Sequence, residues 1–182
     1  MARYKIVGIS FDHMHMGDLL RLVADHPDAE IAGIFDPDPA KMARAVTNFN
    51  IPPDRVFTDF DACMTAAKPD LAMLCAATAD HAAYTGRLAA YGCHVFVEKP
   101  FAASVADARA MIAAMKPTGK LMAINWPLAW VASHVTAKRL IDQGVIGDLL
   151  EVHFYDGNRG PLYHLADKVE VTREEVEAQK TT

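Results

Sequence analysis

A lysine held between a carboxylate and a proline, Glu98-Lys99-Pro100, follows directly after the apolar run from His94 to Val97. That run predicts a buried strand, and ligands of open parallel sheets bind outside the carboxyl ends of the strands. An ammonium group fixed there could meet a substrate oxygen and stabilise negative charge developing on it. The triplet is equally consistent with a strand end whose charges are simply solvated, so spacing alone leaves both interpretations open.

Two earlier positions are typical of a dinucleotide site. Gly8 ends the first apolar run and precedes a predicted helix, whose N-terminus would meet a pyrophosphate. Asp36 closes the run 30–35, where a carboxylate accepts hydrogen bonds from the adenosine ribose and repels a 2'-phosphate. Asp38, directly before Pro39, is the better helix cap, which favours the ribose role for Asp36. With no arginine beside Asp36, the predicted cofactor is NAD rather than NADP.

The glycine-rich loop expected after Gly8 is irregular. A G-x-G-x-x-G pattern starting there needs small residues at positions 10 and 13, but the chain carries Ser10 and His13. The stretch from Ser10 to Met16 is also longer than a standard turn. We therefore expect Ser10, Asp12 and His13 to approach the cofactor along a different path.

The same loop suggests a metal as an alternative. His13 and His15, one residue apart, could share zinc or iron, and His153 and His164 lie further along the chain. No third ligand is fixed by local spacing, so we predict no metal site and favour histidines beside a cofactor phosphate.

Short apolar runs alternate with amphipathic stretches along the chain, which predicts crossover units and a parallel sheet. The fold class is therefore α/β, with a Rossmann-type doubly wound sheet. Ser104 and Pro39 mark helix starts, and Gly92 marks a helix end. Thr78 and His81 follow the fourth run; His81 could lie over the cofactor or be a half-exposed surface residue. Strands are expected near residues 5–9, 30–35, 56–57, 71–76, 94–97 and 121–125.

Composition narrows the classes of function. The 182 residues carry a net charge of −5 and no block of Lys and Arg, which argues against a nucleic-acid surface. No apolar stretch approaches the roughly 20 residues that span a bilayer, and the N-terminus does not look like a signal peptide, so we predict a cytoplasmic protein without membrane contact. Cys63, Cys75 and Cys93 are predicted to be ordinary buried thiols.

Taken together, these motifs resemble the Gfo/Idh/MocA family of oxidoreductases, named for glucose-fructose oxidoreductase and inositol dehydrogenase. The resemblance covers nearly all of residues 5–154, and its specific parts are the Glu-Lys-Pro triplet and the stretch G-V-I-G-D. It implies an N-terminal Rossmann domain, a C-terminal α/β domain with a mostly antiparallel sheet, and hydride transfer between NAD(P) and a hydroxyl carbon of a sugar or cyclitol. The residues that carry it are Gly8, Asp36, Thr78, His81, Glu98, Lys99, Pro100, Asn125 and 138–148.

Residue by residue, the resemblance implies that Lys99 is catalytic and contacts the reacting hydroxyl. Glu98 would lie near the nicotinamide ribose, and Pro100 would shape the turn, often through a cis peptide. Asn125 matches a polar position at the end of the last Rossmann strand. The remaining positions implied to contact the cofactor are Thr78 and His81. Trp126 and Trp130 could stack on a sugar or pack at a domain interface, and both interpretations stay open.

The resemblance also predicts the domain organisation. Residues 1–125 would form the NAD(P)-binding domain, and 126–182 the truncated start of the C-terminal substrate and oligomerisation domain. A strand is expected at 149–155, with its edges unpaired. The general base would lie outside the chain, so the isolated chain should bind cofactor without turnover. The predicted partners are a polyol or sugar-like substrate and further copies of the chain. The alternative is a non-catalytic dinucleotide-binding or sensing module.

Overall fold

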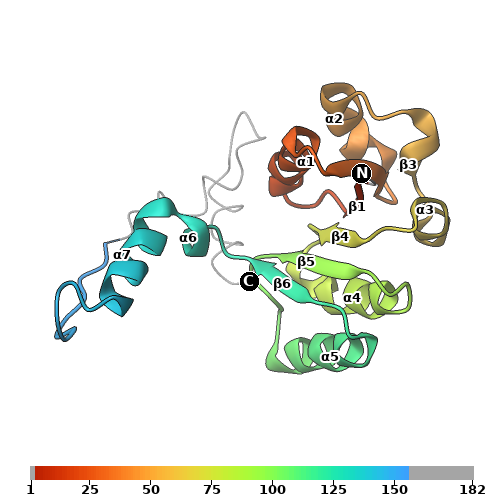
Figure 1. Ribbon diagram of the computed structural model, residues 1–182. Coiled ribbons are helices and arrows are strands. Elements are labelled where there is room, and N and C mark those ends of the chain that lie inside the picture. The colour runs from red at the N-terminus through yellow and green to blue at the C-terminus, as the bar shows by residue number, and fades with distance from the viewer. Residues whose placement is uncertain (1–2, 156–182) are drawn as a thin grey trace, which may run out of the picture. The chain divides into compact units, whose positions relative to one another are not determined.

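Six parallel strands form one sheet in the order β3-β2-β1-β4-β5-β6 (Figure 1). The structure is a computed structural model that describes residues 3–155. The strand order reverses between β1 and β4, which is where doubly wound sheets bind their ligands. The predicted fold class is confirmed. The strands are β1 Tyr4–Ile9, β2 Ala29–Phe35, β3 Val56–Phe57, β4 Leu71–Leu74, β5 His94–Glu98 and β6 Met122–Asn125.

Helices connect successive strands, as the alternating pattern predicts. Helix α2 begins at Pro39 after Asp38, whose side chain accepts a hydrogen bond from the Ala40 N–H, and Ser104 caps α5 in the same way, as predicted. Gly92 has φ +63° in the turn after α4. The helices are α1 His15–Asp25, α2 Pro39–Phe49, α3 Phe60–Ala67, α4 His81–Ala89 and α5 Val105–Met115, with short 3-10 turns η1 Pro53–Arg55, η2 Thr78–Asp80 and η3 Lys116–Thr118.

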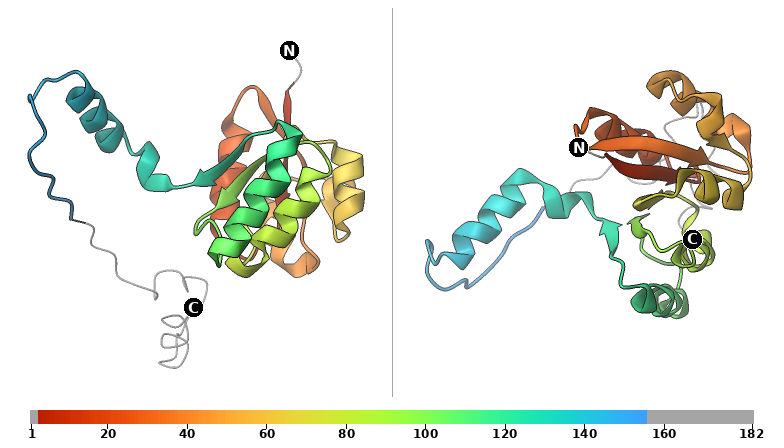
Figure 2. Two further views of the ribbon diagram at one scale, coloured as in Figure 1. Left: turned by 90° about the horizontal axis from the view of Figure 1, so that it is seen from below. Right: turned by 45° about the vertical axis from the view of Figure 1, so that its right-hand side comes forward.

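Two apolar clusters hold the helices against the sheet. On one face, α1 and α2 contribute Met16, Leu20 and Met42, which pack against Ile34 of β2 and Met73 of β4. On the other face α3, α4 and α5 lie side by side, as Figure 2 shows in its left view. Their cluster includes Phe60, Cys63, Leu88, Met111, Val95 and Val97. Most residues of the central strands β1 and β4 are buried, which explains their nearly continuous apolar sequence.

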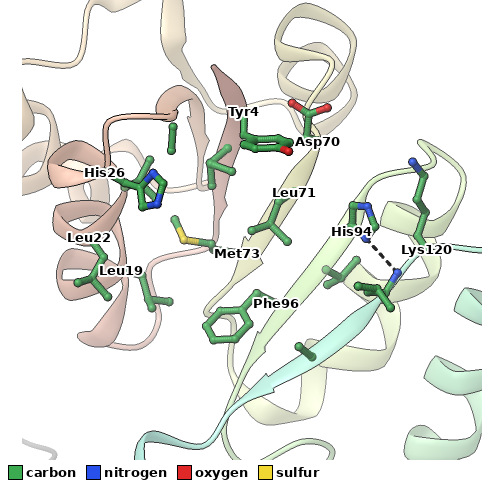
Figure 3. Close-up of a pocket in the computed structure, with 16 residues that line it drawn as sticks. Tyr4, Leu19, Leu22, His26, Asp70, Leu71, Met73, His94, Phe96 and Lys120 are labelled. Atoms are coloured by element: carbon green, nitrogen blue, oxygen red, sulfur yellow. Dashed lines mark hydrogen bonds between the residues drawn. The ribbon is translucent and has the colours of Figure 1, made fainter. Parts of the chain in front are cut away.

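The crossovers leave part of the first face open. Helices α1 and α2 cover the β1–β3 side of that face, whereas the connections of β4, β5 and β6 run over the opposite face. An apolar hollow results beside α1 (Figure 3), and it is lined by residues that include Leu19, Leu22, Leu71, Met73, Phe96 and Ala123. It extends to Tyr4, Asp70, His94 and Leu121, at the amino ends of the strands. A dinucleotide would bind at the opposite edge.

The chain divides between Leu128 and Ala129 into two compact units. In the described residues, the second unit contains helix α7, Ala132–Asp142, and α6, Pro127–Trp130, lies at the division. The prediction of a strand at 149–155 is wrong, because this stretch is irregular and no described strand pairs with it. Trp126 and Trp130 are exposed. None of the described helices is long and apolar enough to cross a membrane.

Candidate functional site

The predicted site residues gather at the carboxyl edge of the sheet because the parallel strands all end there. Ser10, Asp12 and His13 follow β1, Asp36 follows β2, and Thr78 follows β4. Glu98 ends β5, Asn125 ends β6, and the two residues are partners in the register of these strands. This edge therefore carries one continuous row of polar side chains from β2 to β6.

Ser10 shows how the irregular loop replaces the expected glycine. The φ angle of Ser10 is +61°, in the left-handed region of backbone conformation that residues other than glycine rarely adopt. The Ser10 N–H donates to Phe35 O at 2.8 Å, and the His13 N–H donates to Cys75 O at 3.1 Å. The loop is thus fastened to the ends of both β2 and β4. Gly8 allows a close approach, since a Cβ there would lie 2.9 Å from Met16 Sδ.

Asp36 is fully buried and holds the same loop. Its Oδ2 accepts from the Phe11 N–H at 2.7 Å, and its Oδ1 accepts from the Asp38 N–H at 2.9 Å. A carboxylate oxygen has a second lone pair, so each can accept one further bond. Asp36 is therefore placed at the end of β2, as predicted, and it also anchors the loop after β1.

Asp12 links three segments of the chain. Its Oδ2 accepts from Ser10 Oγ at 2.8 Å and from the Ala77 N–H at 3.0 Å, while its Oδ1 accepts from Lys41 Nζ in the first turn of α2. Burial raises the pKa of Asp12, but the hydrogen bonds from Lys41, Ser10 and Ala77 outweigh it and leave the pKa below its ordinary value. Asp12 is therefore ionised at neutral pH. We call these four residues the Asp12 cluster.

Glu98 forms the centre of a second polar group. Only 1% of its surface is exposed. Its Oε1 lies 2.9 Å from His15 Nδ1, and its Oε2 accepts from Asn125 Nδ2 at 2.8 Å. Lys99 Nζ lies 3.9 Å from Glu98 Oε1 and 3.5 Å from His13 Nε2. We call these five residues the Glu98 cluster.

Lys99 is the member of the Glu98 cluster whose position fits the chemistry predicted for it. Its side chain is 22% exposed, compared with 1% for Glu98. The Lys99–Pro100 peptide is cis, as the resemblance implied. A partly exposed amine beside an imidazole and a carboxylate can bind a hydroxyl oxygen and stabilise charge on it.

His81 does not lie in either cluster. It is 1% exposed, and its ring nitrogens lie 3.1 Å from Phe101 O and 3.0 Å from Ala76 O. These contacts tie the start of α4 to the ends of β4 and β5. The surface interpretation of His81 is wrong, because the ring bridges two backbone carbonyls inside the protein. Thr78 lies in η2, three residues before it.

The structure supplies a third potential metal ligand that spacing did not fix. His13, His15 and Glu98 each place one potential ligand atom within 4.8 Å of those of the other two residues. Lys99 Nζ stands beside two of these residues, at 3.5 Å from His13 and 3.9 Å from Glu98. A lysine ammonium would repel a metal ion held there. His164, from the earlier alternative, lies outside the described residues, and His153 lies near Glu151 in the second unit.

The three cysteines are free and buried, as predicted. Burial raises the pKa of the Cys63 thiol to about 12. Burial and the nearby Glu98 charge also raise the pKa of Cys75, at the end of β4 beneath the polar edge. A thiol with a raised pKa is a poor nucleophile, so neither cysteine contributes covalent chemistry.

Sequence reasoning missed two members of the clusters. His15 was considered only as a metal ligand, and its pairing with Glu98 joins residues 83 positions apart. Lys41 was not considered at all, although it lies in the first turn of the helix that follows Asp36. Its position could have been recognised from the sequence, because the turn after β2 commonly determines whether a doubly wound fold prefers NAD or NADP.

Comparisons with known proteins identify the family of the chain. Residues 2–126 match the family model of Gfo/Idh/MocA, described as an oxidoreductase family with an NAD-binding Rossmann fold. D-apiose dehydrogenase from Paraburkholderia graminis is 28% identical over 152 residues, covering 81% of this chain and 38% of the relative. Inositol 2-dehydrogenase from Gluconacetobacter diazotrophicus is 34% identical over 116 residues, covering 61% of this chain and 34% of the relative.

A solved structure shows the same fold. The oxidoreductase from Agrobacterium radiobacter, crystallised with NAD+, L-tartaric acid and magnesium, superposes with a TM-score of 0.74 at 23% identity, over 81% of this chain and 42% of that one. The chain spans about two fifths of the length of the curated relatives it matches.

Proposed function

Because the chain belongs to the Gfo/Idh/MocA oxidoreductase family, we propose that it forms the cofactor-binding part of an NAD-dependent dehydrogenase. The proposed reaction transfers a hydride between nicotinamide and a hydroxyl carbon of a sugar, cyclitol or related polyol. The proposed substrate class is supported by relatives that are dehydrogenases of D-apiose and inositol. The observation that carries the catalytic role is the position of Lys99 at the carboxyl end of β5.

The residues at the edge fit a dinucleotide. Met14, the N-cap residue of α1, makes no side-chain hydrogen bond to the helix, whereas α2, α3 and α5 are all capped by side chains. The His15 N–H at the start of α1 donates to His13 Nδ1 at 3.3 Å, so a pyrophosphate bound at this N-terminus would take the place of the His13 ring as its acceptor. Asp36 is fully buried in this structure, so it would accept the ribose hydroxyls only after the loop that it holds through the Phe11 N–H moves aside. When bound, NAD would supply the hydride acceptor.

In this mechanism Lys99 binds the substrate hydroxyl and stabilises the alkoxide that forms as a general base in the rest of the enzyme takes the hydroxyl proton. Glu98 and Asn125 hold the strand ends that carry Lys99, and His13 borders the amine on its other side. The proposed assembly is a homo-oligomer formed through a second domain. These statements concern the whole enzyme, of which the chain described here supplies the cofactor edge.

Two measurements test the proposal. Calorimetric titration with NAD should show binding to the 182-residue chain. In the whole enzyme, Lys99→Met should reduce the formation of reduced nicotinamide from polyols and aldoses by at least about a hundredfold, the usual loss for a group acting in general acid-base catalysis. Lys116→Met, at the far end of α5, is the matched control and should leave turnover unchanged. Turnover that survives Lys99→Met with the best substrate would remove Lys99 from the mechanism.

A non-catalytic dinucleotide-binding module is the second candidate. The bridge from Asp12 to Lys41 and Ala77 favours it, because this bridge restrains the loop that replaces the G-x-G-x-x-G turn of a typical dinucleotide site. Both candidates bind NAD, so turnover of a polyol by the whole protein separates them. Binding of NAD without turnover of any tested polyol, aldose or cyclitol would favour the binding module.

A further inference from the structure

Lys41 carries a positive charge close to the end of β2. It lies in the first turn of α2, which begins at Pro39, three residues after Asp36. In doubly wound folds this turn decides between the 2'-hydroxyl of NAD and the 2'-phosphate of NADP. A lysine ammonium is a competent phosphate partner as a point charge. Its presence here would by itself favour NADP.

Asp12 engages that cation from the loop after β1. Its Oδ1 accepts from Lys41 Nζ, and its Oδ2 is held by Ser10 Oγ at 2.8 Å and the Ala77 N–H at 3.0 Å. The hydrogen bonds from Ser10 and Ala77 therefore fix the position of the carboxylate that pairs with Lys41. The hydrogen bond to Asp12, together with the charges of Asp36 and Asp38, raises the pKa of Lys41, so the pair is ionic at neutral pH.

We propose that Asp12 is a specificity-determining residue that favours NAD by holding Lys41 away from the 2' position of the adenosine ribose. The inference rests on the proposed function, since it presumes that the adenosine lies at the end of β2. A 2'-phosphate entering this edge would meet the carboxylates of Asp36 and Asp12, with the ammonium of Lys41 already engaged. NAD carries no 2'-phosphate, so the same arrangement does not penalise it.

The test measures the affinities of the 182-residue chain for NAD+ and NADP+ by calorimetry, at one fixed salt concentration because the contrast is electrostatic. Asp12→Asn keeps the shape of the side chain and removes its charge. We expect it to shift the affinity ratio toward NADP+ by about tenfold, equivalent to about 1.4 kcal/mol. The double variant Asp12→Asn with Lys41→Met should return the ratio to that of the parent, because the released cation is gone.

Asp61→Asn is the matched control. Asp61 is an exposed carboxylate of α3 that pairs with Arg87 at 3.3 Å, so its replacement changes the net charge equally and also breaks a surface pair. It should leave the ratio unchanged. An equal gain for both cofactors in Asp12→Asn, or an unchanged ratio with NAD+ still bound, would overturn the inference and leave the proposed function intact. Binding of neither dinucleotide by the parent and all variants would overturn both.

Discussion

The Asp12 cluster and the Glu98 cluster lie on the same edge of the sheet and are built from the same kinds of group, yet their burial differs sharply. The Asp12 side chain is 28% exposed and its partner Lys41 is 41% exposed. Glu98 is 1% exposed, and both of its oxygens are engaged by residues from other elements. The Asp12 cluster joins the loop after β1 to α2 through a partly exposed ion pair, and the Glu98 cluster joins α1, β5 and β6 around a buried carboxylate.

Because of this difference in burial, we expect the two clusters to contribute differently to stability and to ligand binding. A buried carboxylate that loses its partners costs several kcal/mol, whereas an exposed ion pair contributes about 1 kcal/mol or less. The Glu98 cluster is therefore expected to hold the fold in the geometry that presents Lys99. The Asp12 cluster can change with little cost to stability, which suits a residue that selects a cofactor.

The largest effect is expected at Glu98. Glu98→Ala removes a buried carboxylate and leaves two partly buried side chains, His15 and Asn125, without their hydrogen-bond partner. We expect the free energy of unfolding to fall by about 3 kcal/mol, measured by urea denaturation at neutral pH. Glu30→Ala is the control, because Glu30 is a half-exposed carboxylate paired with Arg55 at 3.3 Å. It should cost about 1 kcal/mol or less. Equal losses in both variants would contradict the contrast between buried and exposed pairs.

A smaller effect is expected at His15. His15→Ala removes one of the two partners of Glu98, and the hydrogen bond at 2.9 Å predicts a loss of about 1 to 2 kcal/mol. In the double variant with Glu98→Ala, the His15 change should add little, because its partner is already gone. His26→Ala serves as the control at an exposed position of the turn after α1. Strictly additive losses from His15→Ala and Glu98→Ala would show that the two side chains do not interact.

The regular parts of this edge could be predicted from the sequence, and the contacts across the loop could not. The caps at Asp38 and Ser104 and the alternation of strands with helices depend on local patterns, and the structure has them where the sequence predicts them. The loop after β1 has no such pattern. Its path depends on Ser10 taking a left-handed backbone and on Asp12 reaching Lys41, 29 residues away.

The expected strand at 149–155 failed for a related reason. Its apolar residues, such as Leu150 and Phe154, suit a strand, but a strand needs a neighbour to satisfy its backbone groups. No described strand pairs with this segment, and both side chains are exposed. The local sequence shows only that the segment has a high propensity for β-structure. Whether it forms a strand depends on a pairing partner that local sequence does not specify.

The smallest effect, and the most specific, is the response of the Asp12 cluster to acid. Because the folded-state pKa of Asp12 lies below its ordinary value, its contribution to stability is present above the pKa of the unfolded chain and is lost as pH falls through the folded-state pKa. Asp12→Asn should therefore be less stable than the parent by about 0.5 to 1 kcal/mol near neutral pH. The difference should shrink as the pH falls below about 4, the ordinary range of an aspartate pKa. Urea denaturation at a series of pH values measures this difference in the free energy of unfolding.

Lys41→Met should lower the free energy of unfolding by the same amount as Asp12→Asn, and the double variant should lose no more than either single variant. A deficit in Asp12→Asn that persists unchanged into acid would mean that shape, rather than charge, is what Asp12 contributes to this edge.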